Sequence, residues 1–267
     1  MILGAKLGTR ILVVGLLVAM ACGCAWATVA EDGRVIAEKN GDAVISVEVV
    51  IESTESYEGE SSKRETRSNA TGTIIDPSGL LVSSLSAINP TEMYGSLFAD
   101  DIDDFGFTSD VVDVKIRMSD GKEVSGDVVL RDRDLDLAFI KPKDKLKKDC
   151  PYVDLTNAGD PQMMDEVVML SRLGKLAGRS LAACVDRVQA VVTKPRKLFV
   201  VNENAHNQVG VPAFCLDGKP AGILVMRTAP GSPSSSDFSF RDSMMAAVLP
   251  CSTVARAAEQ AKEVSSE

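Results

Sequence analysis

Short apolar segments separated by glycine-containing turns recur along most of this chain, and this pattern constrains its fold more than any other feature. The turns are Asp76-Pro77-Ser78-Gly79, Ser119-Asp120-Gly121 and Asp217-Gly218. Asp and Gly tolerate the backbone angles of tight turns, and Asp-Gly between two apolar runs is typical of a β-hairpin. Segments such as Ala43–Glu52 alternate apolar and polar residues and are rich in β-branched types, as strands are. We therefore expect an all-β protein.

The same criteria place strands and loops along the rest of the chain. The segment Ser53–Asn69 is polar and without periodicity, which predicts a long exposed loop. Acidic residues gather within Phe98–Phe105, but they lack the alternating oxygen ligands and central glycine of a calcium loop, so we expect no metal site there. Ala229–Asp242 is rich in Ser, Pro and Gly and predicts a loop. Pro250–Glu267 predicts a helix with Ser252 as N-cap. Strands are expected in residues 43–52, twice in 72–84, and in 111–118, 123–130, 135–141, 166–173, 180–192, 198–201, 213–215, 220–226 and 243–249.

The N-terminal segment has the features of an export signal. Lys6 and Arg10 precede the apolar run Ile11–Ala21, and small residues end the segment at Ala27. This order predicts a secretory signal peptide over residues 1–27, and hence a periplasmic or extracellular protein. The alternatives are a membrane anchor, for which the run falls short of the roughly 20 residues that span a bilayer, and a lipid anchor at Cys22.

Charge and cysteine content narrow the classes of partner. The formal net charge of −9 becomes −11 without residues 1–27, so binding to nucleic acid or to an anionic membrane is not expected. No cofactor is predicted. Four cysteines remain, at positions 150, 184, 215 and 251. In an oxidising compartment they allow two disulfides in three connectivities, or four separate thiols. No C-x-x-C pair is left, so no zinc site is expected.

One stretch carries the outline of a catalytic loop. The segment Asn207-Gln208-Val209-Gly210-Val211-Pro212 is followed by a hairpin around Asp217-Gly218. It resembles the G-N-S-G-G-P loop of trypsin-like serine proteases of the HtrA/Deg type. In that alignment Gly210 and Pro212 match, the first glycine falls on Asn207, and the nucleophilic serine falls on Val209.

Two further stretches resemble the same family. Thr71–Ile75 and Gly79–Ser84 follow the family pattern G-S-G-x-I-I…I-V-T-N-x-H, which places the catalytic histidine on Ser86. The stretch Val114–Lys141 ends like the family's D-x-x-x-D-L-A-L-I-K, which places the orienting aspartate on Asp136. An aspartate at a strand end is also explained without catalysis, because it can cap backbone N–H groups.

The resemblance implies a fold and a domain organisation. It predicts two six-stranded antiparallel β-barrels with a short C-terminal helix, the first within residues 28–141 and the second, after a linker, within 142–267. The family's peptide-binding PDZ domain is not expected. Ser86, Asp136 and Val209 would face the cleft between the barrels. The family often ties its linker to the C-terminal helix by a disulfide, which implies Cys150–Cys251 and leaves Cys184–Cys215.

The resemblance also implies that the catalytic chemistry is lost. A serine protease needs a nucleophile, an imidazole base and an orienting carboxylate, and here only Asp136 keeps its type. His206 is the sole histidine and lies on the loop itself, away from the position of the base. Asn207 tolerates positive φ, so with Gln208 and Gly210 it could keep the shape of the oxyanion turn.

Three functions remain open at this point. The first is an inactive protease homologue that binds an extended peptide or a partner protein. The second is an active peptidase with a relocated nucleophile, either a Ser among Ser83, Ser84 and Ser86 or the thiol of Cys215. The third is a structural envelope protein without a ligand.

Overall fold

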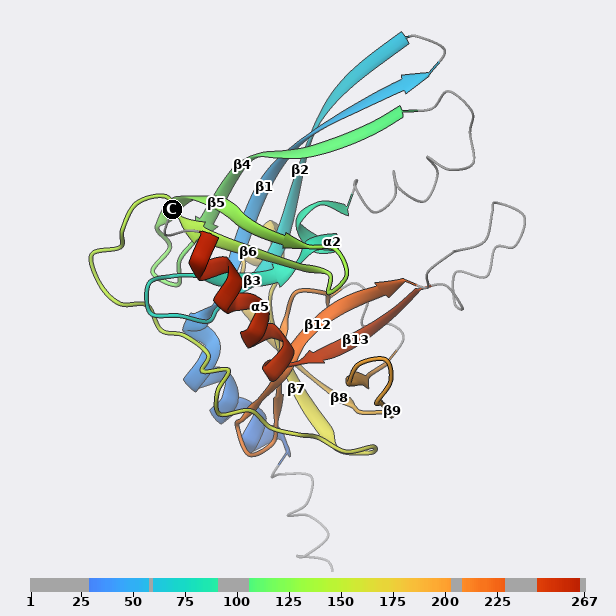
Figure 1. Cartoon of the computed structure of the whole chain (residues 1–267). Helices are drawn as coiled ribbons and strands as arrows, with labels where there is room; N and C mark the ends of the chain where they lie inside the picture. Colours follow the sequence, from blue (N-terminus) through green and yellow to red (C-terminus); the bar gives the residue numbers. More distant parts are fainter. Residues whose placement is uncertain (1–28, 58–59, 91–105, 203–207, 229–243, 265–267) are drawn as a thin grey trace, which may run out of the picture.

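A computed structural model describes residues 29–57, 60–90, 106–202, 208–228 and 244–264 (Figure 1). The expected signal peptide and the alternative anchor at Cys22 lie outside the described residues, as do the acidic stretch at 98–105, His206, Asn207 and the loop at 229–242. The described part contains a helix over residues 29–40, the 3-10 turn η1 (Gly41–Ala43) and two β units.

The first unit is a closed antiparallel barrel in the order β1-β2-β3-β6-β5-β4. Alternate residues of β1, from Ile45 to Ile51, are at most 1% exposed and form its interior, as the period of two requires. The short helix α2 (Leu85–Ile88) follows β3. The strands are β1 (Val44–Tyr57), β2 (Glu60–Ile74), β3 (Leu81–Ser84), β4 (Gly106–Arg117), β5 (Glu123–Asp132) and β6 (Leu137–Pro142).

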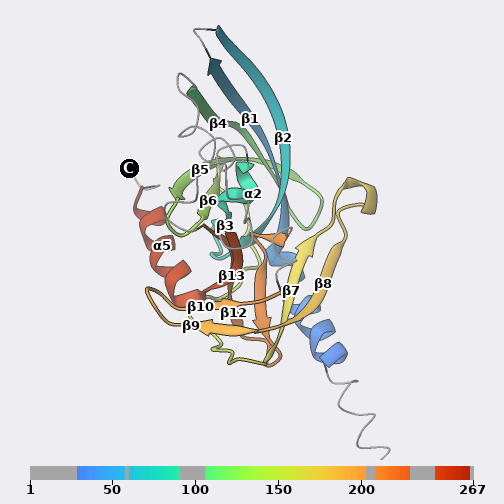
Figure 2. The ribbon, with the colours of Figure 1, turned by 90° about the vertical axis from the view of Figure 1, so that its right-hand side faces the viewer.

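The expected loop at Ser53–Asn69 is wrong, because β1 and β2 continue through it as one long hairpin. Their pairing runs without interruption from Val44↔Thr73 to Tyr57↔Glu60. With the first half of β4, which pairs with β1 as far as Ser56↔Gly106, the hairpin forms an arm that projects from the barrel (Figures 1 and 2). Residues 60–67 are all exposed. The arm is held by backbone hydrogen bonds, so its sequence shows no apolar period.

The second unit is a curled sheet in the order β8-β7-β11-β12-β13-β10-β9. Only Val188 and Gln189 separate β8 from β9, at the two ends of this order, so the chain itself joins the two edges. When β8 and β9 are counted as two halves of one bent strand, the unit repeats the strand order of the first barrel. Its strands are β7 (Glu166–Arg172), β8 (Leu181–Arg187), β9 (Ala190–Val192), β10 (Leu198–Val200), β11 (Pro212–Cys215), β12 (Pro220–Thr228) and β13 (Met244–Pro250), with the 3-10 turn η2 (Lys175–Ala177) between β7 and β8.

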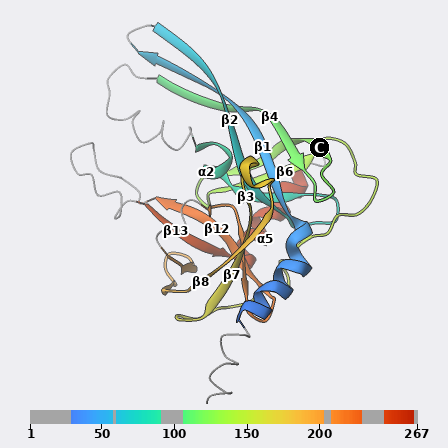
Figure 3. The ribbon, with the colours of Figure 1, turned by 180° about the vertical axis from the view of Figure 1, so that it is seen from behind.

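The C-terminal helix α5 (Cys251–Val264) joins the two units. It contacts β5 of the first unit as well as β12 and β13 of the second, and Val254, Ala257, Ala258 and Ala261 form its buried face. The predicted face is therefore confirmed. The helix begins at Cys251, so Ser252 lies in its first turn and is not its N-cap. The helix over residues 29–40 lies beside β7 (Figure 3), where Gly33 faces Val168.

Arg172, at the end of β7, binds the first unit through main-chain groups. Its Nε and Nη2 donate to the carbonyl oxygens of Val44 and Gly41, at 2.7 and 2.8 Å. Its own backbone N–H donates to Oγ1 of Thr71 at 3.1 Å.

The predicted all-β class, with two antiparallel barrel-like units and a C-terminal helix, is confirmed, and the junction between the units lies next to the predicted site.

Candidate functional site

Asp136 lies in the turn between β5 and β6, at the junction of the two units. Its backbone has a φ of 57°, which is uncommon for a residue other than glycine but tolerated by Asp. Its carbonyl oxygen accepts a hydrogen bond from the N–H of Leu85 at 3.0 Å, which fixes the turn against α2. The residue is 6% exposed, so its carboxylate needs partners inside the protein.

Four donors supply those partners, two on each carboxylate oxygen. Oδ1 accepts from the Ser86 N–H at 2.8 Å and from the Ser86 hydroxyl at 2.7 Å. Oδ2 accepts from the Ser84 hydroxyl at 2.6 Å and from the N–H of Met226, on β12 of the second unit, at 2.7 Å. A carboxylate offers about four acceptor positions, so these bonds occupy the group completely. Burial raises the pKa of the Asp136 carboxyl, and the four hydrogen bonds act in the opposite direction.

Ser86, the position predicted for the base, is thus brought against Asp136. Ser84 caps α2, since its Oγ accepts from the Ala87 N–H at 3.3 Å while it donates to Asp136. This cap turns the backbone so that the N–H and the hydroxyl of Ser86 both point to one carboxylate oxygen. A serine hydroxyl does not act as a base near neutral pH, so this pair cannot remove a proton as an imidazole would.

The loop with Val209 packs onto the same place from the second unit. Gly210 has a φ of +91°, and a Cβ there would lie 2.5 Å from the Ser83 Oγ and 3.0 Å from the Ser84 backbone nitrogen. Its N–H donates to the Leu224 carbonyl at 2.6 Å, which ties the loop to β12. Val209 is half-buried against the core of the second unit. The Gln208 Oε1 accepts from the Cys184 thiol at 3.3 Å, while Asn207 lies outside the described residues.

Neither of the alternative nucleophiles is activated. Ser83 donates to the Thr71 carbonyl at 2.7 Å and is fully buried, and Ser84 and Ser86 both donate to Asp136. Burial raises the pKa of the Cys215 thiol to about 11, so it is protonated near neutral pH. Burial likewise raises the pKa of Cys150 and Cys184, and that of Cys251 to about 12. Thiol nucleophiles react as thiolates.

The two predicted disulfides are not formed, because all four described cysteines are free thiols. Cys184 on β8 pairs with Met169, and Cys215 on β11 pairs with Val167, so the two cysteines flank β7 on opposite sides. Two strand spacings amount to about 10 Å, whereas a disulfide requires Cα atoms within about 7 Å. Cys251 is completely buried and donates to the Pro220 carbonyl at 3.2 Å instead of bonding to Cys150.

Sequence reasoning found Asp136, Ser84 and Ser86 but missed the fourth donor. The Met226 N–H is a backbone group that every residue except proline carries, so no side chain in the sequence marks it. Among the described residues, no three His, Cys, Asp or Glu side chains gather as a metal site would need. The described helices include none that is both long and apolar enough to cross a bilayer.

No protein-family model matches this chain, and no curated protein matches it.

Proposed function

We propose that this protein is a non-catalytic homologue of trypsin-like serine proteases that binds an extended peptide segment of a partner protein. The observation that carries the proposal is the saturated carboxylate of Asp136. In a serine protease this carboxylate orients an imidazole. Here the Ser86 hydroxyl takes the bond that an imidazole N–H would take, and Val209 offers no nucleophilic atom on the facing loop.

The edge of β12 next to Asp136 supports peptide binding. Strand β12 pairs with β13 as far as Thr228↔Met244, but its pairing with β11 ends at Ile223. Leu224 exchanges hydrogen bonds with Gly210 and Val211 on this edge. The next N–H on the same edge is that of Met226, which donates to Asp136. Within the described chain, no strand pairs with this edge of β12 beyond Leu224. An extended peptide can add to such an edge through main-chain hydrogen bonds.

Activity and binding are tested on the purified chain. We expect no cleavage of casein or of fluorogenic peptides, and saturable binding of an extended peptide from a random library. Replacement of Thr228 by proline removes one edge N–H and should weaken the peptide, whereas Lys122→Gln, on the distant β4–β5 turn, should not. Cleavage that is lost in Ser84→Ala or Cys215→Ala would overturn the proposal in favour of an active peptidase. Failure to bind any peptide, together with no captured partner, would favour a structural role.

The double variant Ser86→His with Val209→Ser tests whether the cleft keeps the geometry of a catalytic site. If the cleft keeps the family's geometry, the imidazole at 86 binds the acceptor position on Asp136 that the Ser86 hydroxyl leaves, and the hydroxyl at 209 binds the imidazole. We expect a low but measurable peptidase activity that Asp136→Ala abolishes. The single variants should stay inactive, since each lacks one of the two reacting groups.

A further inference from the structure

A cluster of basic side chains lies on the outer face of the first barrel, away from Asp136. Neighbouring strands present two cross-strand rows there: Ser46 on β1 lies opposite Arg117 on β4, and Glu48 lies opposite Lys115. Arg117 in turn lies opposite Glu123 on β5. These residues line one depression, over which the loop between β7 and β8 contributes Arg179. Both units therefore form its wall.

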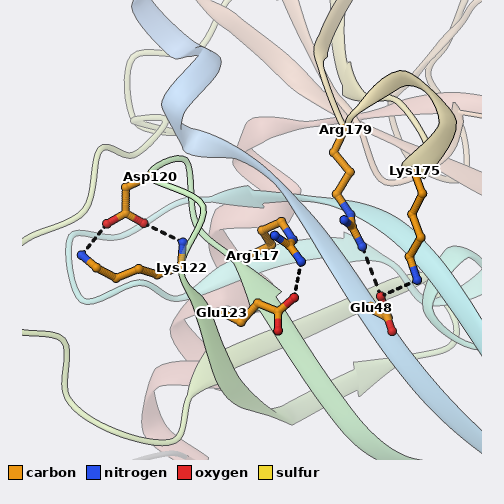
Figure 4. A network of polar contacts seen from close by, with 7 residues as sticks. All are labelled: Glu48, Arg117, Asp120, Lys122, Glu123, Lys175 and Arg179. Carbon is orange, nitrogen blue, oxygen red and sulfur yellow. Dashed lines mark hydrogen bonds and ion pairs between the residues drawn. The ribbon is translucent and has the colours of Figure 1, made fainter.

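The carboxylates at this depression are fewer than its cations, and Figure 4 shows the ion pairs that they form. Glu48 binds both Lys175 at 3.2 Å and Arg179 at 3.3 Å, and Glu123 binds Arg117. Lys115 makes no ion pair within the described residues. Four cations thus face two carboxylates. Residues 44–142, by contrast, hold twenty acidic and nine basic residues, a formal charge of −11, so the cluster is a positive spot in an acidic unit.

A hydroxyl in the wall of the depression has no hydrogen-bond partner within the described residues. Ser46 is 7% exposed and lines the depression, yet its side chain makes no hydrogen bond within the described part of the chain. Arg117 and Arg179 each engage one carboxylate, and a guanidinium carries five N–H donors, so both keep donors to spare. Hydroxyl, ammonium and guanidinium groups around one point are the donors that tetrahedral oxyanions use.

We propose that this depression binds a phosphate or another tetrahedral oxyanion group, held by Ser46, Lys115, Arg117 and Arg179. Since Arg179 belongs to the second unit and the other three to the first, the bound anion stabilises the contact between the units. The site is independent of the function proposed for the Asp136 region. Its ligand is either free inorganic phosphate or a phosphomonoester, and the two share the same recognition chemistry.

The test uses the purified full chain. Thermal unfolding is followed in sodium phosphate and in sodium chloride at equal pH and ionic strength, and inorganic phosphate, sulfate and O-phosphoserine are titrated by calorimetry. We expect a saturable rise in Tm with phosphate that chloride does not reproduce, because a ligand of the folded state stabilises it by mass action. Preference for O-phosphoserine over inorganic phosphate would identify a phosphomonoester as the ligand, and the reverse would identify the free ion.

Variants that change one charge distinguish specific phosphate binding from a general effect of salt. Lys115→Gln should weaken phosphate binding about tenfold, the usual size of a hydrogen bond to a charged group, and Glu123→Gln should strengthen it by removing a repulsive charge. Lys122→Gln is the matched control, since Lys122 pairs with Asp120 on the same hairpin outside the depression. Equal effects of phosphate and chloride, or equal losses in Lys115→Gln and Lys122→Gln, would overturn the proposal. Circular dichroism verifies that each variant is folded.

Discussion

Replacing Asp136 by asparagine should destabilise the protein, because the carboxylate has a symmetric set of donors. Each of its oxygens accepts one backbone N–H and one hydroxyl: Ser86 supplies both on Oδ1, and Met226 and Ser84 supply them on Oδ2. An amide has one oxygen and one NH₂ group. The hydroxyl that faces the NH₂ group can turn and accept, but the backbone N–H cannot. Either orientation of the amide therefore leaves one buried N–H against another donor.

The magnitude follows from that single unpaired group. A buried donor without a partner costs about 1–3 kcal/mol. The neutral amide avoids the cost of burying a charge, which is seen in the raised pKa of Asp136. We therefore expect the free energy of unfolding to fall by about 2 kcal/mol. For a chain of this size that corresponds to a fall in Tm of roughly 4–8 °C. Asparagine tolerates the positive φ of this position, so backbone strain adds little.

The assay is chemical and thermal unfolding of wild type and variants at neutral pH. Ser86→Ala removes one hydroxyl and should cost about 1 kcal/mol. Asp127→Asn is the surface control: its carboxylate is 62% exposed and lies 3.3 Å from Lys143, so the change should stay within about 0.5 kcal/mol. If Asp136→Asn is no more destabilising than Asp127→Asn, the four-donor description of the site is wrong.

Three further predictions concern the packing and charge of the fold. Thr73 is fully buried and its Oγ1 finds no partner within the described residues, so Thr73→Val should stabilise the protein by about 1 kcal/mol; Thr71→Val, which removes the acceptor of the Arg172 N–H, should destabilise it in the same unfolding experiment. Gly210→Ala introduces a Cβ 2.5 Å from the Ser83 Oγ at positive φ and should cost about 2 kcal/mol or more, whereas Gly121→Ala, at a φ of +84° with open space around it, measures the backbone strain alone; equal losses would mean that the 208–211 loop does not pack on Ser83. The hydrogen bond from Lys175 lowers the pKa of Glu48. This bond therefore contributes up to about 1 kcal/mol of stability above the unfolded-state pKa of about 4.3, and the contribution disappears as pH falls through the lowered pKa of the folded state. The stability advantage of wild type over Glu48→Gln should shrink over that range, and an advantage that grows on acidification would contradict the assignment.

The sequence predicted best those parts of the fold that bury an apolar face. The strands with alternating or apolar residues were found, as were the turns with glycine and the buried face of α5. The long β1–β2 hairpin was not, because residues 60–67 lie outside the core and gain their order from backbone pairing with β1, which leaves no mark on hydrophobicity. The bend at Val188 and Gln189 was missed for a similar reason, since a strand that changes partner keeps its period.

At the site, the family resemblance placed Ser86 and Asp136 at one cleft, because it brings two distant segments together. It did not predict the hydrogen bonds between the two residues. The Met226 N–H could not be predicted, since a backbone donor depends on where β12 lies. The prediction of a Cys184–Cys215 disulfide was wrong because pairing by elimination takes no account of strand order. Strand β7 lies between the two cysteines.

The anchoring of Arg172 has a consequence for how the chain can be divided. Its guanidinium binds two carbonyl oxygens of the N-terminal half, and both of these contacts between the halves would be lost if that half were produced alone. Cleavage between residues 143 and 165 should therefore leave a nicked protein whose fragments remain associated and melt in a single cooperative transition. Neither fragment, expressed separately, is expected to give a soluble, folded product.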